Sequence, residues 1–290
     1  MDTRIKNLIL SPLNLLYRYS PELALKVVFK LKNGYKLNLR NPVTYNAKLQ
    51  WIKLYDKDPN MPICADKFAV RQYVKNRGCE EILNDLIWEG FDPLDIPFES
   101  LPNQFVIKVT HGSGFNIICT DKKKLSIPKT LRKLNNWLKA EFIPAYGEWF
   151  YGQIKPRIII ERFLSDEDGA VPSDYKVMCF HGQPKFIVVD TDRFINHKRN
   201  IYDVHWNLLE GYKMGFPNDI QLEKPKQLKL LLEYSRKLSS EFKHARIDLF
   251  VVDDRVYFGE ITFTNGAGFD KITPHSFDVE MGDLIRLPSK

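Results

Sequence analysis

Two alternating runs of apolar residues near the C-terminus restrict the fold more than any other feature of the sequence. The runs, residues 245–252 and 256–263, flank Asp253-Asp254-Arg255 and predict a β-hairpin. With a three-residue loop, Val252 would pair with Val256, and Asp248 would lie directly opposite Glu260. The apolar neighbours of the two carboxylates would then turn to the other face, into the core.

The polar face of this hairpin is a candidate metal site, because the period of two places Arg246, Asp248, Glu260 and Thr262 together. Two opposed carboxylates repel each other, and a hard cation such as Mg²⁺, shared with substrate phosphates, would relieve the repulsion. The alternative is a solvated face on which Arg246 forms an ion pair with either carboxylate. The hairpin alone leaves both readings open. A two-residue loop would put the carboxylates on opposite faces and remove the site.

A second candidate segment, residues 105–118, has the pattern of strand, glycine-containing turn and strand. Lys108 lies near the end of the first strand, and the turn consists of His111, Gly112, Ser113 and Gly114. Glycines let backbone N–H groups approach phosphate oxygens closely, and a lysine can neutralise their charge. The alternative is an ordinary hairpin turn. The segment is not a P-loop, because the pattern G-x-x-x-x-G-K-[ST] is absent.

A third candidate segment begins at Asp174 and Lys176, which share one face of a strand that is otherwise apolar. The alternative for Lys176 is a side chain that faces solvent. The preceding strand ends in Glu161, Arg162, Phe163 and Leu164. We hypothesise that this end forms an adenine hinge, with backbone groups of Arg162 and Leu164 reaching the base.

The order of predicted elements indicates an α+β fold. Residues 1–100 are expected to be mainly helical and to lie on the substrate side, with helices near 47–54 and 66–74. Residues 101–290 are expected to form the catalytic region. Its predicted strands are 105–109, 115–120, 157–163, 175–180 and 185–190, followed by the hairpin. Its predicted helices are 128–141 and 222–243.

Composition excludes several classes of protein. Charged residues make up 27% of the chain and hydrophobic residues 44%, as in soluble globular proteins. The four cysteines lack C-x-x-C spacing and are expected to be reduced and structural, and the histidines form no zinc motif. The net charge of +7 suits phosphate-bearing ligands. No basic run with interleaved aromatic residues predicts nucleic-acid binding.

The first 32 residues mix leucines with lysines and arginines. Pro12 and Pro21 interrupt this stretch before it could span a bilayer, so we expect neither a transmembrane helix nor a cleavable signal. A cationic amphipathic stretch allows at most peripheral membrane contact. We expect instead a pair of short helices packed on their own domain, and a cytoplasmic protein.

Taken in order, I-K, H-G-S-G, I-I-E-R-F-L, D-Y-K, R-x-D and G-E-x-T resemble the ATP-grasp superfamily. The fuller run adds Asp66-Lys67 with Arg71, Tyr202-Asp203 with Trp206, and F-G-E-I-T-F. It resembles the TupA-like ATP-grasp branch, which is associated with teichuronopeptide and capsular polysaccharide assembly, from about Asn41 to the C-terminus. The resemblance implies an ATP-grasp fold, in which two α+β subdomains clasp ATP.

The resemblance also implies roles for individual residues. Lys108, Lys176 and the turn from His111 to Gly114 would bind phosphates near Asp174, and Glu161 to Leu164 would hold adenine. Arg246, with Lys176, would act on the transferring phosphate, and Asp248 and Glu260 would bind Mg²⁺. Many ATP-grasp enzymes have asparagine where this chain has Thr262. The third metal ligand is therefore open between Thr262, Asn265 and water.

The reaction implied is an ATP-dependent carboxylate–amine ligation through an acyl phosphate, in surface polysaccharide modification. The acceptor would be a uronic acid or an amino acid, and an amine would complete the amide. Candidate residues near these substrates are Asp66, Lys67, Arg71, Arg193 and Lys198.

Three other functions are compatible with parts of the sequence. Asp190 and Asp192 have the D-x-D spacing of a sugar-nucleotide glycosyltransferase, although the early β-α-β repeat of a nucleotide-sugar domain is missing. A kinase would use the same ATP site and stop at a phosphorylated hydroxyl. A catalytically silent binding protein would leave the opposed carboxylates without a purpose.

Overall fold

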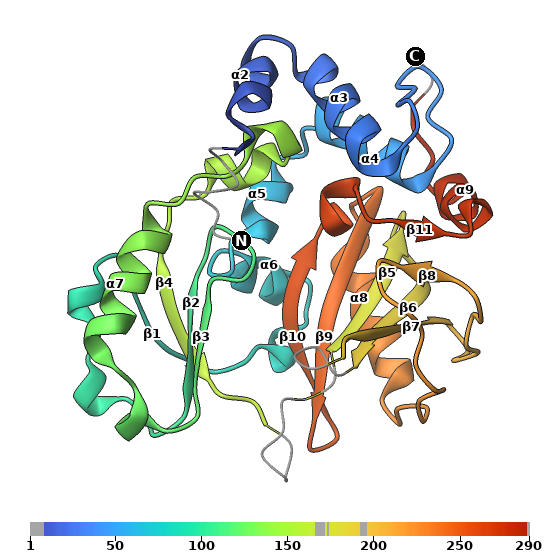
Figure 1. Cartoon of the computed structure of the whole chain (residues 1–290). Coiled ribbons are helices and arrows are strands. Elements are labelled where there is room, and N and C mark those ends of the chain that lie inside the picture. The colour runs from blue at the N-terminus through green and yellow to red at the C-terminus, as the bar shows by residue number, and fades with distance from the viewer. Residues whose placement is uncertain (1–8, 166–171, 173, 192–195, 289–290) are drawn as a thin grey trace.

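Two antiparallel sheets stand side by side beneath a group of helices in a computed structural model of the chain (Figure 1). The structure describes residues 9–165, 172, 174–191 and 196–288. The strands divide between the two sheets in sequence order. The last helix of the chain lies against the N-terminal helices. The α+β class predicted from the sequence is confirmed.

The first sheet has four strands in the order β1-β4-β2-β3. These strands are β1 (Leu86–Gly90), β2 (Phe105–Val109), β3 (Asn116–Cys119) and β4 (Ile158–Arg162). Helix α7 (Ile127–Leu138) covers one face, where Leu134 packs with Phe105, Ile107 and Ile160. The other face carries Lys108 and Glu161, because side chains alternate along a strand.

The second sheet has five strands in the order β10-β9-β5-β6-β7. These strands are β5 (Asp174–Phe180), β6 (Gln183–Thr191), β7 (Lys198–Asp203), β9 (His244–Val252) and β10 (Arg255–Thr262). Helix α8 (Leu228–Ser239) packs on β5, β6 and β9. The short strands β8 (Lys213–Met214) and β11 (Ile272–Thr273) form a separate pair.

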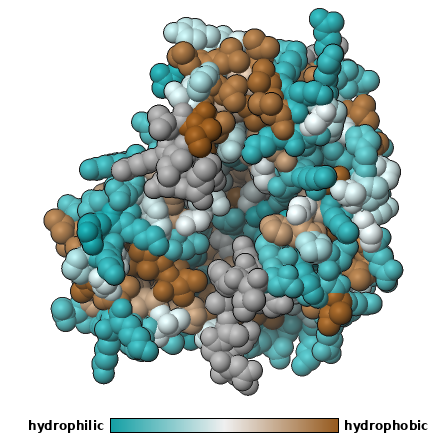
Figure 2. All heavy atoms as spheres, viewed as in Figure 1, coloured by the Kyte–Doolittle hydropathy of each residue, from teal (hydrophilic) through white to brown (hydrophobic). Residues whose placement is uncertain are grey.

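The N-terminal region is helical, as predicted, although β1 also comes from it. Its helices are α2 (Ser11–Tyr19), α3 (Pro21–Asn33), α4 (Tyr45–Tyr55), α5 (Asn60–Ala65) and α6 (Val70–Asn76). Prolines in the first turns of α2 and α3 and the side-chain cap of Thr44 on α4 fix where these helices begin. Helices α2, α3, α4 and α9 (His275–Asp283) lie along the top, where apolar side chains also gather on the surface (Figure 2).

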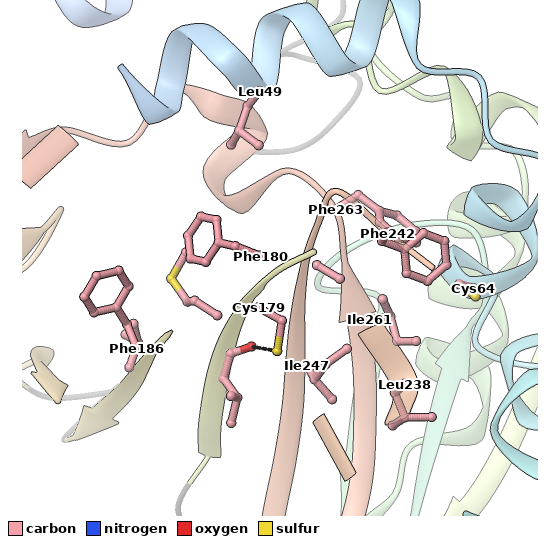
Figure 3. Close-up of a cluster of buried hydrophobic side chains, with 14 of the residues drawn as sticks. Leu49, Cys64, Cys179, Phe180, Phe186, Leu238, Phe242, Ile247, Ile261 and Phe263 are labelled. Carbon is pink, nitrogen blue, oxygen red and sulfur yellow. Dashed lines mark hydrogen bonds between the residues drawn. The ribbon is translucent and has the colours of Figure 1, made fainter. Parts of the chain in front are cut away.

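The larger core lies between the second sheet, α8 and the N-terminal helices. Phe242 packs on Phe263 there, near Ile261, and Phe180 packs on Phe186 (Figure 3). All four cysteines are buried and free of disulfide bonds. Burial raises the pKa of each thiol, so these residues act as small apolar side chains and not as thiolates.

The β9–β10 hairpin differs from the prediction in its loop and in the predicted pairing of Val252 with Val256, and it agrees with the predicted pairing of the two carboxylates. Arg255 pairs with Val252, so the loop is the two residues Asp253 and Asp254, both with positive φ. The predicted three-residue loop is wrong. A β-bulge at Gly259 then shifts the register by one residue, so Glu260 pairs with Asp248 as predicted. The two-residue loop therefore does not separate the carboxylates, because the bulge compensates for it.

Candidate active site

The polar face of the β9–β10 hairpin is held together by Arg246. Its Nε and Nη2 donate to Asp248 Oδ1 and Oδ2 at 2.7 and 2.6 Å, a bidentate ion pair. Nη2 also contacts Glu260 Oε1 at 3.5 Å and Thr262 Oγ1 at 3.2 Å, and Nη1 donates to Asn265 Oδ1. The four residues predicted to share this face do so, and Asn265 joins them.

Burial sets the electrostatics of this cluster. It raises the pKa of Asp248 to about 6, an effect that Arg246 opposes and Asp174 reinforces. Burial also acts against the charge of Arg246, but Asp248 and Glu260 outweigh it and raise the pKa of the guanidinium. The arginine therefore stays charged, paired with Asp248 and in contact with Glu260.

Strand β5 brings Lys176 to the same face of the sheet, opposite Asp248 in register. Lys176 is buried and donates to Asp174, and its Nζ lies 3.3 Å from Asp190 Oδ2. The solvent-facing alternative for Lys176 is therefore wrong.

Asp190, on β6, is itself held by Arg199, which donates to its two oxygens at 2.6 and 3.0 Å. Burial acts to raise the pKa of Asp190, but Arg199 and Lys176 hold it well below its usual range. The sequence indicated Asp190 only as the first aspartate of a D-x-D motif. Its partner Asp192 lies outside the described residues.

The first sheet contributes a second set of charges. Lys108 Nζ donates to Glu161 Oε2 at 2.6 Å, and Arg71 Nη1 donates to Glu161 Oε1 at 3.2 Å. Arg71 also donates to the carbonyl of Asn84 at 2.8 Å, which fixes the guanidinium next to β4. Glu161 is buried, so Lys108 and Arg71 both pair with a carboxylate that has little access to water.

The two sets of charges act on one another across the two sheets. Burial lowers the pKa of Lys67, and Lys108 adds to this effect while Glu260 opposes it. Burial would raise the pKa of Glu260, but Lys67, Arg246, Lys108 and Lys176 together lower it. Cationic residues from both sheets and from the α5–α6 segment thus interact electrostatically with one carboxylate.

The glycine-containing turn joins β2 to β3 beside these charges. Lys67 Nζ donates to the carbonyl of Gly112, and the buried His111 contacts the carbonyl of Ala140 through Nε2 at 2.8 Å. Ser113 and Gly114 are exposed, and Gly114 has a φ of 78°. The turn is therefore anchored at its first half, and its second half is accessible to a ligand.

The end of β4, predicted as an adenine hinge, is partly occupied by its own neighbours. The N–H of Arg162 donates to the carbonyl of Asp85 at 3.0 Å, and its carbonyl accepts from Asn84 Nδ2 at 2.8 Å. Phe163 is buried and Leu164 is partly exposed. Of the two residues in the hypothesis, only Arg162 has its backbone N–H and carbonyl engaged by other described residues.

The side chains on and beside the hairpin offer the type of ligand atom that a hard divalent cation prefers. Asp248, Glu260, Thr262 and Asn265 all present oxygen atoms, which Mg²⁺ prefers. Within the described ranges, no group of three or more His, Cys, Asp or Glu residues gathers to hold a metal. An ion here would therefore take two carboxylates from the protein and its remaining ligands from amide, hydroxyl, water or phosphate oxygens.

A separate cavity of about 720 Å³ lies behind the glycine-containing turn. Its lining includes His111, Tyr17 and Arg18 of α2, Lys139, Phe142 and Tyr151. The lining combines aromatic side chains with the cationic Arg18 and Lys139 and the anionic Glu141, and it does not include the carboxylates of the hairpin. Nothing in the sequence predicted this cavity, because its walls combine residues 17–21 with residues that lie far away along the chain, from 111 to 156.

The remaining sequence candidates have local partners. Asp66 Oδ1 accepts from the N–H groups of Phe68 and Ala69, and Lys198 Nζ pairs with Asp219 at 3.0 Å. Arg193 lies outside the described residues. Among the described helices, none is long and apolar enough to cross a membrane.

The sequence matches one protein family, described as TupA-like ATPgrasp, over residues 47–286. No curated protein matches it.

Among solved structures, a D-alanine–D-alanine ligase from Bacillus anthracis complexed with ATP is 17% identical, with a TM-score of 0.47. The match covers 77% of this chain and 65% of that one. An L-amino acid ligase from Bacillus licheniformis is 16% identical, with a TM-score of 0.48, over 87% of this chain and 57% of that one. The chain thus spans less than two thirds of the length of either structure.

Proposed function

Because this chain belongs to the TupA-like ATP-grasp family, a family of ATP-dependent ligases, we propose that it joins a carboxylate to an amine through an acyl phosphate. The matched range agrees with the resemblance from about Asn41 onward, and it confirms the ATP-grasp fold. Membership gives the fold and the use of ATP. The roles of individual residues rest on the arrangement of charges.

The observation that carries the proposal is the pairing of Asp248 with Glu260 across the hairpin, with Arg246 in contact with both carboxylates. The positive charges of Lys67, Lys108 and Lys176 act together with that of Arg246 to lower the pKa of Glu260. Phosphoryl transfer requires positioning and charge neutralisation more than a nucleophilic side chain. A site rich in fixed positive charge, with two carboxylates for a cation, suits that chemistry.

Each charged residue has a role in this proposal. Lys108 and Lys176 hold the phosphates of ATP, and Arg246 neutralises the phosphoryl group during transfer. Asp248 and Glu260 hold Mg²⁺, with Thr262, Asn265 or water as the third ligand. The ion, when bound, would neutralise phosphate oxygens.

The remaining parts of ATP would lie along the first sheet. The exposed half of the turn, Ser113 and Gly114, offers backbone N–H groups to phosphate oxygens. The residues after Glu161 line the adenine, with Leu164 as its backbone partner.

We further propose that the acceptor enters the cavity behind the turn. The aromatic side chains Tyr17 and Tyr151 suit the apolar face of a sugar ring, and Arg18 and Lys139 suit its carboxylate. A uronic acid or an amino acid in a surface polysaccharide pathway meets these requirements. The reaction would take place in the cytoplasm, where ATP is present and the buried cysteines stay reduced.

Trapping with hydroxylamine tests the proposed reaction. The purified protein is incubated with ATP, Mg²⁺ and a panel of uronates and amino acids, with hydroxylamine in place of the amine. A ligase should release ADP and phosphate in equal amounts and form a hydroxamate from the activated carboxyl. A kinase would retain the phosphate on a stable product. A glycosyltransferase would consume a sugar nucleotide and leave ATP intact.

Oxygen-18 in the acceptor carboxylate tests the intermediate. Attack of the amine on an acyl phosphate carries one labelled oxygen into the released phosphate. Unlabelled phosphate accompanying amide formation would exclude the acyl-phosphate route.

A further inference from the structure

An apolar stripe lies on the outer side of α2 and α3 (Figure 2). It consists of Leu15, Tyr19, Leu23 and Leu31, whose exposed fractions run from 49% at Leu23 to 83% at Tyr19. Within α2, Leu15 and Tyr19 are four residues apart, and within α3, Leu23 and Leu31 are eight apart, so each pair shares one helix face. We call these four residues the outer stripe.

The outer stripe is not needed for packing of the helices on the domain. Helix α3 already buries Ala24, Leu25, Val28 and Phe29 against the core on its opposite face. The predicted packing of the N-terminal helices is therefore present, and it leaves a second apolar face in water. Exposed apolar patches of this kind mark sites of contact with a protein or a membrane.

Positive charge is concentrated on the same segment. Residues 1–40 carry +6 of the net charge of +7, because they contain eight basic residues and two acidic ones. The basic residues are Arg4, Lys6, Arg18, Lys26, Lys30, Lys32, Lys36 and Arg40, and the acidic residues are Asp2 and Glu22. Lys30, Lys32 and Lys36 are exposed, and Glu22 is already paired with Lys26 at 2.6 Å.

We propose that α2 and α3 dock the protein on an anionic membrane surface. The leucines of the outer stripe enter the boundary between headgroups and acyl chains, and the basic residues contact the anionic headgroups. A second copy of the chain is the less suitable occupant, because an isologous contact would bring two +6 segments together. The proposal does not depend on the reaction that the enzyme catalyses.

Cosedimentation with vesicles tests the proposal on the full chain. One set of vesicles is phosphatidylcholine alone, and the other contains roughly a third phosphatidylserine, which supplies the anionic surface. The wild type should bind the anionic vesicles and not the neutral ones. Raising the salt concentration to about 1 M should release it, because the Debye length falls to about 3 Å.

Two double variants separate the apolar and the charged contributions. Leu23→Ser with Leu31→Ser, and separately Lys32→Ser with Lys36→Ser, should each weaken binding to anionic vesicles by about tenfold or more. Leu94→Ser is the matched control, because Leu94 is 74% exposed and Leu31 is 73% exposed, but Leu94 lies beside the first sheet. It should bind like the wild type. Circular dichroism should show the same helical content in all variants, because the changed side chains are exposed.

Three outcomes would overturn the proposal. These are no binding of the wild type to anionic vesicles, an equal loss in Leu94→Ser, and undiminished binding in both double variants. Sedimentation equilibrium adds a fourth. If the wild type dimerises and the leucine variant is monomeric, while neither binds vesicles, the outer stripe is an interface between two copies of the chain.

Discussion

At the scale of single residues, Arg246 decides how the hairpin carboxylates behave. Its bidentate pair with Asp248 is the ion pair that the sequence offered as an alternative to a metal site. The pair is buried and lies beside a second carboxylate, so it differs from a solvated surface pair. Arg246 contacts both carboxylates. An ion pair with Arg246 is therefore compatible with a metal site at the same two carboxylates.

Replacing either carboxylate should abolish turnover, but at different costs in stability. We expect Glu260→Gln and Asp248→Asn to reduce release of phosphate from ATP on the order of 10²-fold or more, because the cation loses a charged ligand. The side chain of Asp248 is 6% exposed, whereas that of Glu260 is 40% exposed, so Asp248→Asn should also lower the free energy of unfolding more. Near-normal turnover in both variants, in a phosphate-release assay, would remove the metal assignment.

His244 should make the protein sensitive to mild acid. Burial lowers the pKa of His244 to about 4, and its ring contacts the carbonyl of Phe263 and the hydroxyl of Tyr45. The unfolded chain protonates this histidine near pH 6.5, and the folded protein resists protonation down to about pH 4. Stability should therefore fall as the pH drops through this window, by about 3 kcal/mol in total.

Urea denaturation at a series of pH values checks this expectation. His244→Asn should be less stable than the wild type at pH 8, and its stability should depend less on pH between about 6.5 and 4. His205→Asn, at an exposed position, is the control and should keep the wild-type slope. Equal slopes in all three proteins would show that another group causes the acid sensitivity.

At the scale of elements, the hairpin shows how the predicted pairing of Asp248 with Glu260 is present although the predicted loop length is wrong. The alternation predicted two strands and a shared polar face, and both are present. The loop was misjudged because Asp253 and Asp254 adopt positive φ, which aspartate tolerates only with help from a tight turn. The bulge has a signal in the sequence. The buried side chains fall on even numbers at Val256 and Phe258 and on odd numbers at Ile261 and Phe263.

The bulge itself can be tested at Gly259. A Cβ there would lie 2.9 Å from the carbonyl oxygen of Asp248 and 2.9 Å from the ring of Phe250. Gly259→Ala should therefore cost about 1–3 kcal/mol of stability and displace Glu260 from Asp248. Turnover should fall on the order of 10²-fold, because a small misplacement of a catalytic group is sufficient.

Gly211→Ala is the matched control for the bulge. Gly211 has a φ of 81° and open space around its Cα, so alanine should cost a comparable amount of stability without changing turnover. The role of the bulge would be refuted if the two variants lost stability and activity to the same degree.

The strands that the sequence did not predict are β1, β7 and the short pair β8 and β11. β1 and β7 each lie at one end of a strand order, and β7 begins with Lys198-Arg199-Asn200. Such polar residues weaken the apolar alternation, and strands of two residues are too short to show one. The central strands β4 and β5 are almost entirely buried and were found within one residue of their ends.

At the scale of the whole molecule, the candidate active site combines residues from both sheets. Lys108 and Glu161 lie on strands of the first sheet and Lys67 lies just before α6, whereas Lys176, Arg246 and Glu260 lie on strands of the second sheet. Each motif could be recognised separately in the sequence, and only the family resemblance indicated that the motifs form one site. The cavity behind the turn could not be found in this way, because α2 contributes Tyr17 and Arg18 to a wall that the motifs do not include.

A nucleotide that bridges the sheets should couple their stabilities. Lys108 lies on β2 of the first sheet and Lys176 on β5 of the second, and both act on Glu260. A bound ATP analogue should therefore raise the unfolding temperature of the wild type by mass action. Methionine at either position keeps the stem of the side chain and removes its charge, and we expect affinity to fall roughly tenfold to a hundredfold.

The double variant distinguishes a bridging phosphate from two independent contacts. If Lys108 and Lys176 hold the same phosphate group, calorimetry on Lys108→Met, Lys176→Met and their combination should give non-additive losses in binding free energy. Additive losses would place the lysines on different parts of the ligand. Unchanged affinity for a non-hydrolysable ATP analogue in both single variants would move the nucleotide away from the two sheets. Lys198→Met is the control, because Lys198 is paired with Asp219 at 3.0 Å on an edge strand and should not affect nucleotide binding.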